Sequence, residues 1–129
     1  MVNSQRLTLL VHRGMYCICR LGPAEPLPAW TARSEFCSVT RTLEELSVVC
    51  DQDVVPPQIE ANRGWRLLRV QGTLDFSLVG VLAGLTTTLA NANVSVFAAS
   101  THDTDYLLVR DETLDRAIMA FREAGYAVG

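Results

Sequence analysis

The hydrophobic pattern of the second half of the chain predicts alternating strands and helices. Apolar runs at 65–71, 94–98 and 106–109 have the length and β-branched content of strands. Between the first two runs, apolar residues recur at the spacing of one helix face: Leu78, Val81, Leu82, Leu85 and Leu89. We therefore expect a core-facing helix that opens close after the 72–75 turn.

A second helix is predicted near the C-terminus. Asp111 or Thr113 can cap it and Gly125 ends it, after which 126–128 can add a strand. Its apolar stripe consists of Leu114, Ala117, Ile118 and Phe121. The order from residue 65 is β-α-β-β-α-β, the ferredoxin-like arrangement of an α+β fold.

The first half of the chain reads as short strands separated by turns. Strands are expected at 7–11, 15–21, 34–41 and 46–50, and 51–64 is expected to connect the halves. Three prolines exclude a regular helix from 22–29 and leave at most a helical turn near 27–32: Pro23, Pro26 and Pro28. The polar turn and strand at 41–49 resemble those at 100–108, which indicates an eroded internal repeat.

Composition and charge exclude several classes of function. At 129 residues the chain is the size of one domain, and a net charge of −3 with scattered arginines argues against nucleic-acid binding. The uncharged stretch 76–101 is interrupted by threonine and asparagine, so we expect no membrane span. The polar N-terminus, 1–6, has no signal-peptide pattern, and a cytoplasmic location is expected.

The four cysteines are Cys17, Cys19, Cys37 and Cys50. They form no CxxC pair and have no histidine at metal spacing, so an all-cysteine zinc site is disfavoured. Cys17 and Cys19 lie two apart on a predicted strand and share a face. We expect reduced, buried thiols, and neither a metal nor a cofactor.

The turn at 72–75 and the polar loop at 100–105 hold the most informative chemistry. Free N–H groups at a helix start attract an anion, whereas the carboxylate of Asp103 or Asp105 can receive a cation. A zwitterion satisfies both requirements. A free amino acid is the simplest candidate.

Two groups of residues resemble the ACT domain family. The first group surrounds a polar turn before an apolar strand: Ser38, Val39, Thr40, Arg41, Thr42, Glu45, Leu46, Ser47, Val48 and Val49. The second comprises the 65–72 strand with Leu74, Asp75, Phe76, Gly80, Ser100, Thr101, Thr104 and Asp105. The resemblance covers about 7–125 and is to small stand-alone bacterial proteins with two ACT-like units, to aspartate kinase regulatory domains and to the CASTOR arginine sensors of animal cells.

The resemblance implies an α+β fold in which a ferredoxin-like βαββαβ unit at 59–129 packs with a degenerate, strand-rich ACT-like half at 1–58 as one globular unit. It also implies that a small effector, commonly an amino acid, is held between ACT-like units. The ligand-binding positions it implies are Gly72, Leu74, Asp75, Phe76, Val79, Thr101, His102, Thr104 and Asp105, with Ser47 and Val48 from the other unit.

Each of these positions also has an ordinary structural interpretation. Asp75 suits a ligand ammonium and a helix cap equally, Asp105 can stabilise its turn, and Thr101 has a turn role if no ligand binds. His102 adjoins Asp103, but neighbouring residues on a turn generally point apart, so we expect a loop residue or a pocket wall. No nucleophile is identifiable, and no catalytic residue is predicted.

The leading hypothesis is a non-catalytic, amino-acid-binding regulatory protein, with basic amino acids as a candidate ligand class. We expect it to form a homodimer or to dock onto a regulated enzyme, without nucleic-acid or membrane partners. The alternative is a structural module that assembles through sheet edges. Gly80 and Gly84 packed against a protein backbone would favour that alternative.

Overall fold

The computed structural model describes residues 7–129. The prediction that 1–6 have no signal-peptide pattern concerns residues outside this range. The chain divides into two compact units. We call residues 7–13 with Arg66–Gly129 the helical unit, and Gly14–Trp65 the strand unit. This division differs from the predicted boundary at 58/59, because the first strand belongs with the C-terminal part of the chain.

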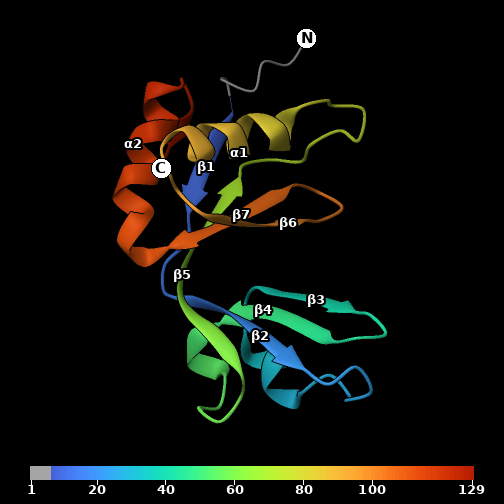
Figure 1. Cartoon of the computed structure of the whole chain (residues 1–129). Coiled ribbons are helices and arrows are strands. Elements are labelled where there is room, and N and C mark those ends of the chain that lie inside the picture. The colour runs from blue at the N-terminus through green and yellow to red at the C-terminus, as the bar shows by residue number, and fades with distance from the viewer. Residues whose placement is uncertain (1–6) are drawn as a thin grey trace. The chain divides into compact units, whose positions relative to one another are not determined.

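The helical unit is a sheet with two helices (Figure 1). Its sheet runs in the order β6, β7, β5, β1, β8. The elements are β1 (Thr8–Val11), β5 (Ala61–Val70), α1 (Val81–Asn91), β6 (Val96–Ser100), β7 (Asp105–Arg110), the 3-10 turn η4 (Asp111–Thr113), α2 (Leu114–Glu123) and β8 (Ala127–Val128). The βαββαβ order is therefore confirmed, and β1 is inserted between β5 and β8.

The inserted strand is held on both sides. β1 pairs antiparallel with β5, with Leu9 opposite Val70, and parallel with β8, with Leu9 opposite Val128. Leu9 and Val70 are fully buried in the core that the helices cover. The predicted stripes supply most of the helical side of that core: Val81, Leu85, Leu89, Leu114, Ala117 and Phe121.

The start of α1 and the cap of α2 correct two expectations. α1 begins only at Val81, because Gly80 has a left-handed φ of 83° and interrupts the helix there. Thr113 stands at the N-cap of α2, but its hydroxyl donates to the Arg110 carbonyl and caps no helical N–H. The end of α2 is as predicted, since Gly125 has a φ of 99° and Tyr126 N–H donates to the Phe121 carbonyl.

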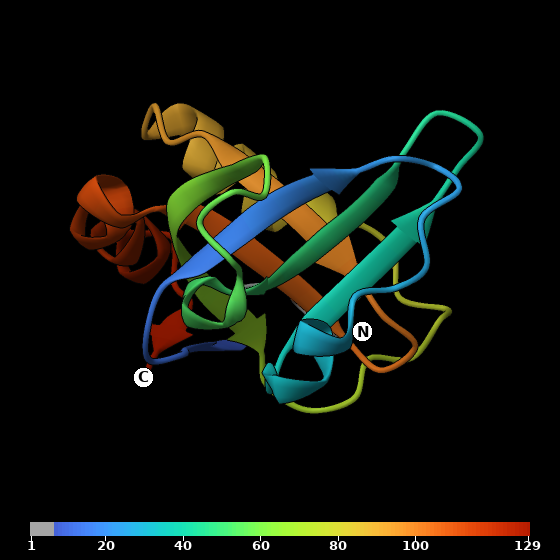
Figure 2. The ribbon, with the colours of Figure 1, turned by 90° about the horizontal axis from the view of Figure 1, so that it is seen from below.

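The strand unit repeats the same topology without α-helices (Figure 2). Its antiparallel strands run in the order β3, β4, β2, β5. The elements are β2 (Tyr16–Leu21), the 3-10 turn η2 (Ala29–Arg33), β3 (Cys37–Arg41), β4 (Leu46–Asp51), the 3-10 turn η3 (Gln52–Val54) and the first part of β5. In a βαββαβ unit each of these turns would be a helix, which agrees with the expected eroded repeat.

Local sequence explains the lost helices. Pro28 immediately precedes η2, and the segment leading to it also contains Pro23 and Pro26. The segment after η3 contains Pro56 and Pro57. The β3–β4 hairpin is closed by the Thr42 hydroxyl, which accepts the N–H groups of Glu44 and Glu45.

No helix within residues 7–129 is long and apolar enough to cross a membrane. The uncharged stretch 76–101 instead forms a loop, α1 and all of β6. Val81, Leu85 and Leu89 of α1 are buried in the core of the helical unit.

Candidate functional site

The segment before α1 and the loop between β6 and β7 meet at one hollow in the helical unit. Leu74 N–H donates to the Asp103 carbonyl at 2.6 Å, which joins the two segments directly. The hollow has a volume of about 440 Å³, within the usual range for small-molecule sites. It is lined by Leu74, Asp75, Phe76, Leu78, Gly80, Val81, Leu82, Ala83, Ser100, Thr101, His102, Asp103, Thr104 and Asp105.

The 101–104 turn is a tightly bonded loop with a buried anchor. Thr101 donates its N–H and its hydroxyl to the Thr104 carbonyl at 2.9 and 3.1 Å. The hydroxyl of Thr104, which is only 4% exposed, donates to the Val70 carbonyl at 2.8 Å. These bonds fix the loop to the end of β5, so the neighbouring carboxylates are held by a rigid support.

Residues 81–83, in the first turn of α1, line the hollow. The first bond within α1 runs from Gly84 N–H to the Gly80 carbonyl at 2.9 Å, so the N–H groups of residues 81–83 have no partner inside the helix. The predicted donors at 74–76 lie in the preceding turn. There, the Leu74 N–H already donates to the Asp103 carbonyl.

The polar lining of the hollow is acidic. Asp75, Asp103 and Asp105 line it, and neither lysine nor arginine does. One oxygen of Asp105 accepts the Ser100 hydroxyl at 2.7 Å, which orients that half-buried carboxylate. The acidic lining therefore favours a cationic group, while the N-terminal turn of α1 favours an anionic one.

Asp75 stabilises a turn and does not cap a helix, which corrects one of its two predicted roles, because α1 begins only at Val81. Its carboxylate accepts the Ser77 N–H at 2.8 Å, and its carbonyl accepts the Leu78 N–H at 3.0 Å. The Ser77 backbone and hydroxyl hydrogen bonds lower the pKa of Asp75 below its usual value. Asp75 is exposed and lines the hollow.

His102 and Asp103 do not point apart, which corrects the expectation for adjacent turn residues. His102 Nδ1 lies 2.9 Å from an Asp103 carboxylate oxygen, and both side chains are exposed. The His102 ring also meets the Phe76 ring edge to face, with centroids 5.1 Å apart. His102 and Phe76 both line the hollow, so the His102 ring lies where a pocket wall was predicted.

The structure brings together most of the predicted site residues in the helical unit. Leu74, Asp75, Phe76, Thr101, His102, Thr104 and Asp105 line the hollow, whereas Gly72 and the 95% exposed Val79 do not. Ser47 and Val48 lie on β4 of the strand unit, where Val48 is fully buried in the core.

Sequence reasoning missed the lining residues Leu78, 80–83 and Ser100. The signal that was missed is Gly80, whose left-handed conformation fixes the start of α1. The free N–H groups of the helix are therefore those of residues 81–83 and not those of 74–76.

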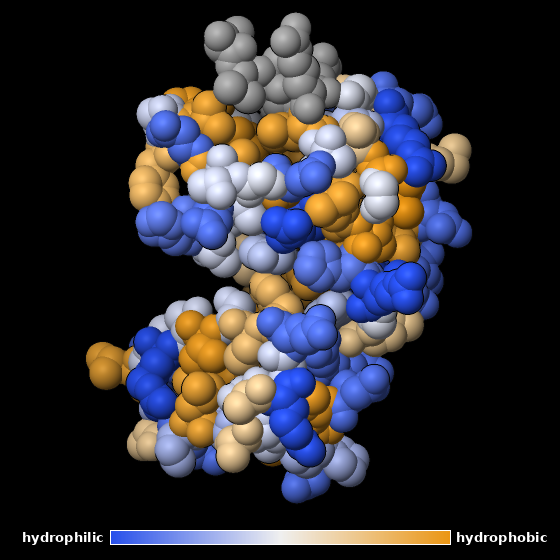
Figure 3. Space-filling model, turned by 180° about the vertical axis from the view of Figure 1, so that it is seen from behind, coloured by the Kyte–Doolittle hydropathy of each residue, from blue (hydrophilic) through white to orange (hydrophobic). Residues whose placement is uncertain are grey.

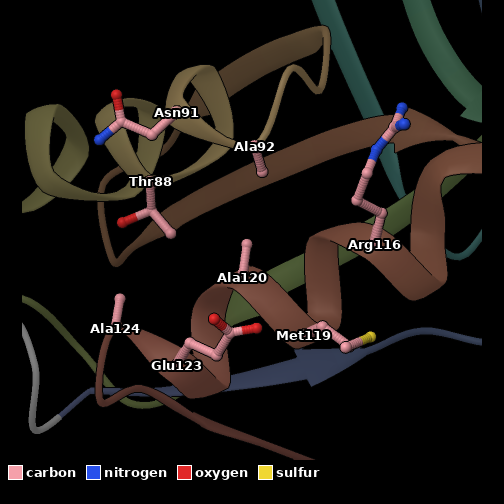
Figure 4. A pocket seen from close by; sticks show the side chains of 8 residues that line it. All are labelled: Thr88, Asn91, Ala92, Arg116, Met119, Ala120, Glu123 and Ala124. Atoms are coloured by element: carbon pink, nitrogen blue, oxygen red, sulfur yellow. The ribbon is translucent and has the colours of Figure 1, made fainter.

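A second hollow lies in the groove between α1 and α2 (Figure 4). It has a volume of about 490 Å³, and its small residues, Ala92, Ala120 and Ala124, let the two helices approach. Arg116 contacts the Asn93 carbonyl at 3.4 Å, just beyond the end of α1. This groove is therefore a packing interface between the two helices. Its lining includes one acidic side chain, Glu123, and one basic side chain, Arg116.

Comparisons with known proteins place the chain in a family. A family model described as an ACT domain matches residues 60–123, and a model described as an N-terminal domain matches 14–58. A solved protein of Agobacterium tumefaciens is 34% identical, with a TM-score of 0.90 over 96% of this chain and 92% of that chain. No curated protein matches significantly.

Two more distant structures share the fold. A protein of Vibrio cholerae, described as of unknown function and a possible transport protein, has a TM-score of 0.76 at 20% identity, over 95% of this chain and 92% of that chain. The ligand-free regulatory subunit of aspartate kinase from Thermus thermophilus has a TM-score of 0.64 at 14% identity, over 90% of this chain and 96% of that chain. The chain belongs to the ACT domain family, with its ACT domain at residues 60–123.

Proposed function

We propose that the protein is a non-catalytic amino-acid sensor whose ligand binds in the hollow between the start of α1 and the 101–105 loop. Its family and its similarity to aspartate kinase regulatory subunits support a regulatory, ligand-binding role in general. The observation that carries the finer proposal is the meeting of helix amides and acidic side chains at one hollow. A free amino acid carries both complementary charges.

The ligand α-carboxylate is assigned to the N–H groups of residues 81–83. These groups are unbonded within α1 and carry the partial positive charge of a helix N-terminus. Gly80 lines the same hollow, and no atom lies within 4 Å of where its Cβ would stand. The space beside the amides is therefore open to a ligand.

The ligand ammonium is assigned to Asp105, with the Thr101 carbonyl as a further acceptor. Asp105 is half-buried and already oriented by Ser100, so one of its oxygens remains for the ligand. Asp75 and Asp103 add negative charge beyond what one ammonium requires. We therefore expect basic amino acids to bind more tightly than neutral ones of similar size.

Binding at this hollow would connect the segment before α1 with the 101–105 loop. A ligand that contacts both segments favours the conformations in which the segments lie together. It therefore changes the relative populations of the conformations that a partner protein can bind. We expect this regulated surface to serve a homodimer or a docked enzyme. The proposed function needs no chemical step in the hollow.

The test is isothermal titration of the folded protein against each of the twenty amino acids. We expect saturable binding of at least one of them, and the Asp105→Asn variant should weaken it while an exposed acid on α2, changed as Asp115→Asn, should not. A folded protein that binds none of the twenty would contradict the proposal.

The alternative of a purely structural module has less support. Gly80 borders open space instead of a protein backbone, so the feature that would have favoured the alternative is absent at this residue. On the face that Figure 3 shows, hydrophobic residues form several groups separated by hydrophilic ones. Scattered groups of this kind do not mark one dominant docking surface on that face.

A further inference from the structure

Three buried thiols meet in the strand unit. Cys17, Cys19 and Cys50 are 0%, 1% and 0% exposed, and their sulfur atoms all lie within 4.8 Å of one another. The Sγ atoms of Cys17 and Cys19 are 3.5 Å apart, and all three thiols are free. The predicted reduced, buried thiols are confirmed for these three cysteines, whereas Cys37 is exposed.

Strand pairing produces the cluster. Cys17 on β2 stands directly opposite Cys50 on β4, and Cys19 follows two residues after Cys17, so all three side chains share one face of the sheet. The surrounding cluster is apolar and is closed by partly buried Trp30, Val54, Ile59 and Ala61. No pattern in the linear sequence connects Cys50 with the other two.

The three sulfur atoms are close enough to ligate one shared ion. The Sγ atoms of Cys17 and Cys19 lie within hydrogen-bond distance of each other, and either thiol can donate. The positive charge of Arg63 also acts on Cys17 and Cys19. A thiolate is the form of cysteine that ligates metals.

The number and burial of the sulfurs discriminate between metals. Structural zinc sites use four ligands, and three-ligand zinc sites keep an open position for water. Within residues 7–129 no histidine or carboxylate completes this group, and the cluster is sealed from solvent. Cu(I) is soft, selects thiolates, and is satisfied by two or three sulfur ligands without water.

We propose that the strand unit binds one Cu(I) ion through the sulfur atoms of Cys17, Cys19 and Cys50. Each thiol that becomes a thiolate ligand releases its proton, and copper keeps its oxidation state throughout. Cys37 is exposed on the edge strand β3 and stands directly opposite Cys50, but it is not one of the three clustered sulfurs.

The test is anaerobic titration of the reduced full chain with Cu(I) in competition with a coloured Cu(I) chelator. We expect about one ion per chain to be retained, with thiolate-to-copper absorption in the ultraviolet. Cys50→Ser should weaken binding more than about a hundredfold, since loss of a ligand exceeds the cost of losing an outer-shell contact. Cys37→Ser is the matched control, because Cys37 lies outside the three-sulfur cluster, and it should leave the Cu(I) affinity unchanged.

Two further measurements keep the test decisive. If Cys50→Ser fails to fold by tryptophan fluorescence, Cys50→Ala replaces it, because a small apolar side chain suits the buried site. Failure of the wild-type protein to hold copper against the chelator would overturn the proposal, as would equal retention by folded Cys50→Ala. Zn(II) displacing Cu(I), or a Cys17–Cys50 disulfide persisting in reductant, would also overturn it.

Discussion

Apart from the inserted β1, the two units of this chain have the same order of strands, but they differ in what covers the sheet. In the helical unit, α1 and α2 bury a core of thirteen residues. In the strand unit, two short 3-10 turns take the helix positions, and the buried cluster has seven residues, three of which are cysteines. The comparison indicates that antiparallel strand pairing preserves this topology after its helices are lost, while the side chains available for function change.

The units should differ most in the cost of the same core substitution. We expect Leu85→Ala, in the helical unit, to lower the free energy of unfolding by about 4–5 kcal/mol, and Leu46→Ala, in the strand unit, by about 2–3 kcal/mol. Both leucines are fully buried. The smaller cluster, covered by irregular chain, can collapse further around the cavity.

Denaturant unfolding with two probes measures this difference. Both tryptophans, Trp30 and Trp65, lie in the strand unit, and both α-helices lie in the helical unit, so fluorescence and helical circular dichroism report the units separately. Equal costs for the two leucines would contradict the proposed difference in packing.

The buried anchor of the 101–104 turn gives the next largest effect. Thr104→Val keeps the shape of the side chain but removes the hydroxyl that donates to the Val70 carbonyl. We expect about 1–3 kcal/mol less stability, together with weaker amino-acid binding, because the loop loses its attachment to β5. The exposed Thr73→Val is the control, and a similar loss there would argue against the anchor.

The sequence predicted features that depend on a few neighbouring residues better than features that depend on contacts between distant strands. Local signals predicted most of the strands, the helical stripes and the end of α2 at Gly125, because hydrophobic period and glycine position act over a few residues. The start of β5 at Ala61 was not predicted, since 51–64 was expected to be a connector. The insertion of β1 and the meeting of Cys50 with Cys17 depend on pairing between distant strands. The site segments were predicted, but the amide donors were placed too early because the conformation of Gly80 was not recognised.

Because Gly80 has a left-handed conformation, the loss of stability on substitution should depend on the residue that replaces it. Gly80→Ala should cost about 1–2 kcal/mol even though no atom lies near the added Cβ, because alanine is strained at this φ. Gly80→Asn should cost less, since asparagine tolerates the region, as Asn93 does at a φ of 59°. Thermal unfolding measures both, and a greater loss for asparagine would contradict the conformational explanation.

Charge removal in the hollow should have the smallest effect. Asp105→Asn retains an oxygen for the Ser100 hydroxyl but removes the negative charge, and we expect ligand affinity to fall about threefold to tenfold. The same substitution should leave Cu(I) binding by the strand unit unchanged. Titration of both ligands into this variant checks whether the two units bind independently.

Amide NMR during titration with arginine is the most direct test of an amino-acid site at the start of α1. We expect the largest chemical-shift changes at residues 81–83 and 101–105, and we expect these changes to saturate together with one affinity. Shifts confined to the α1 and α2 groove around Thr88 and Ala120, or no shifts with arginine or any other amino acid, would contradict a sensor site at the start of α1.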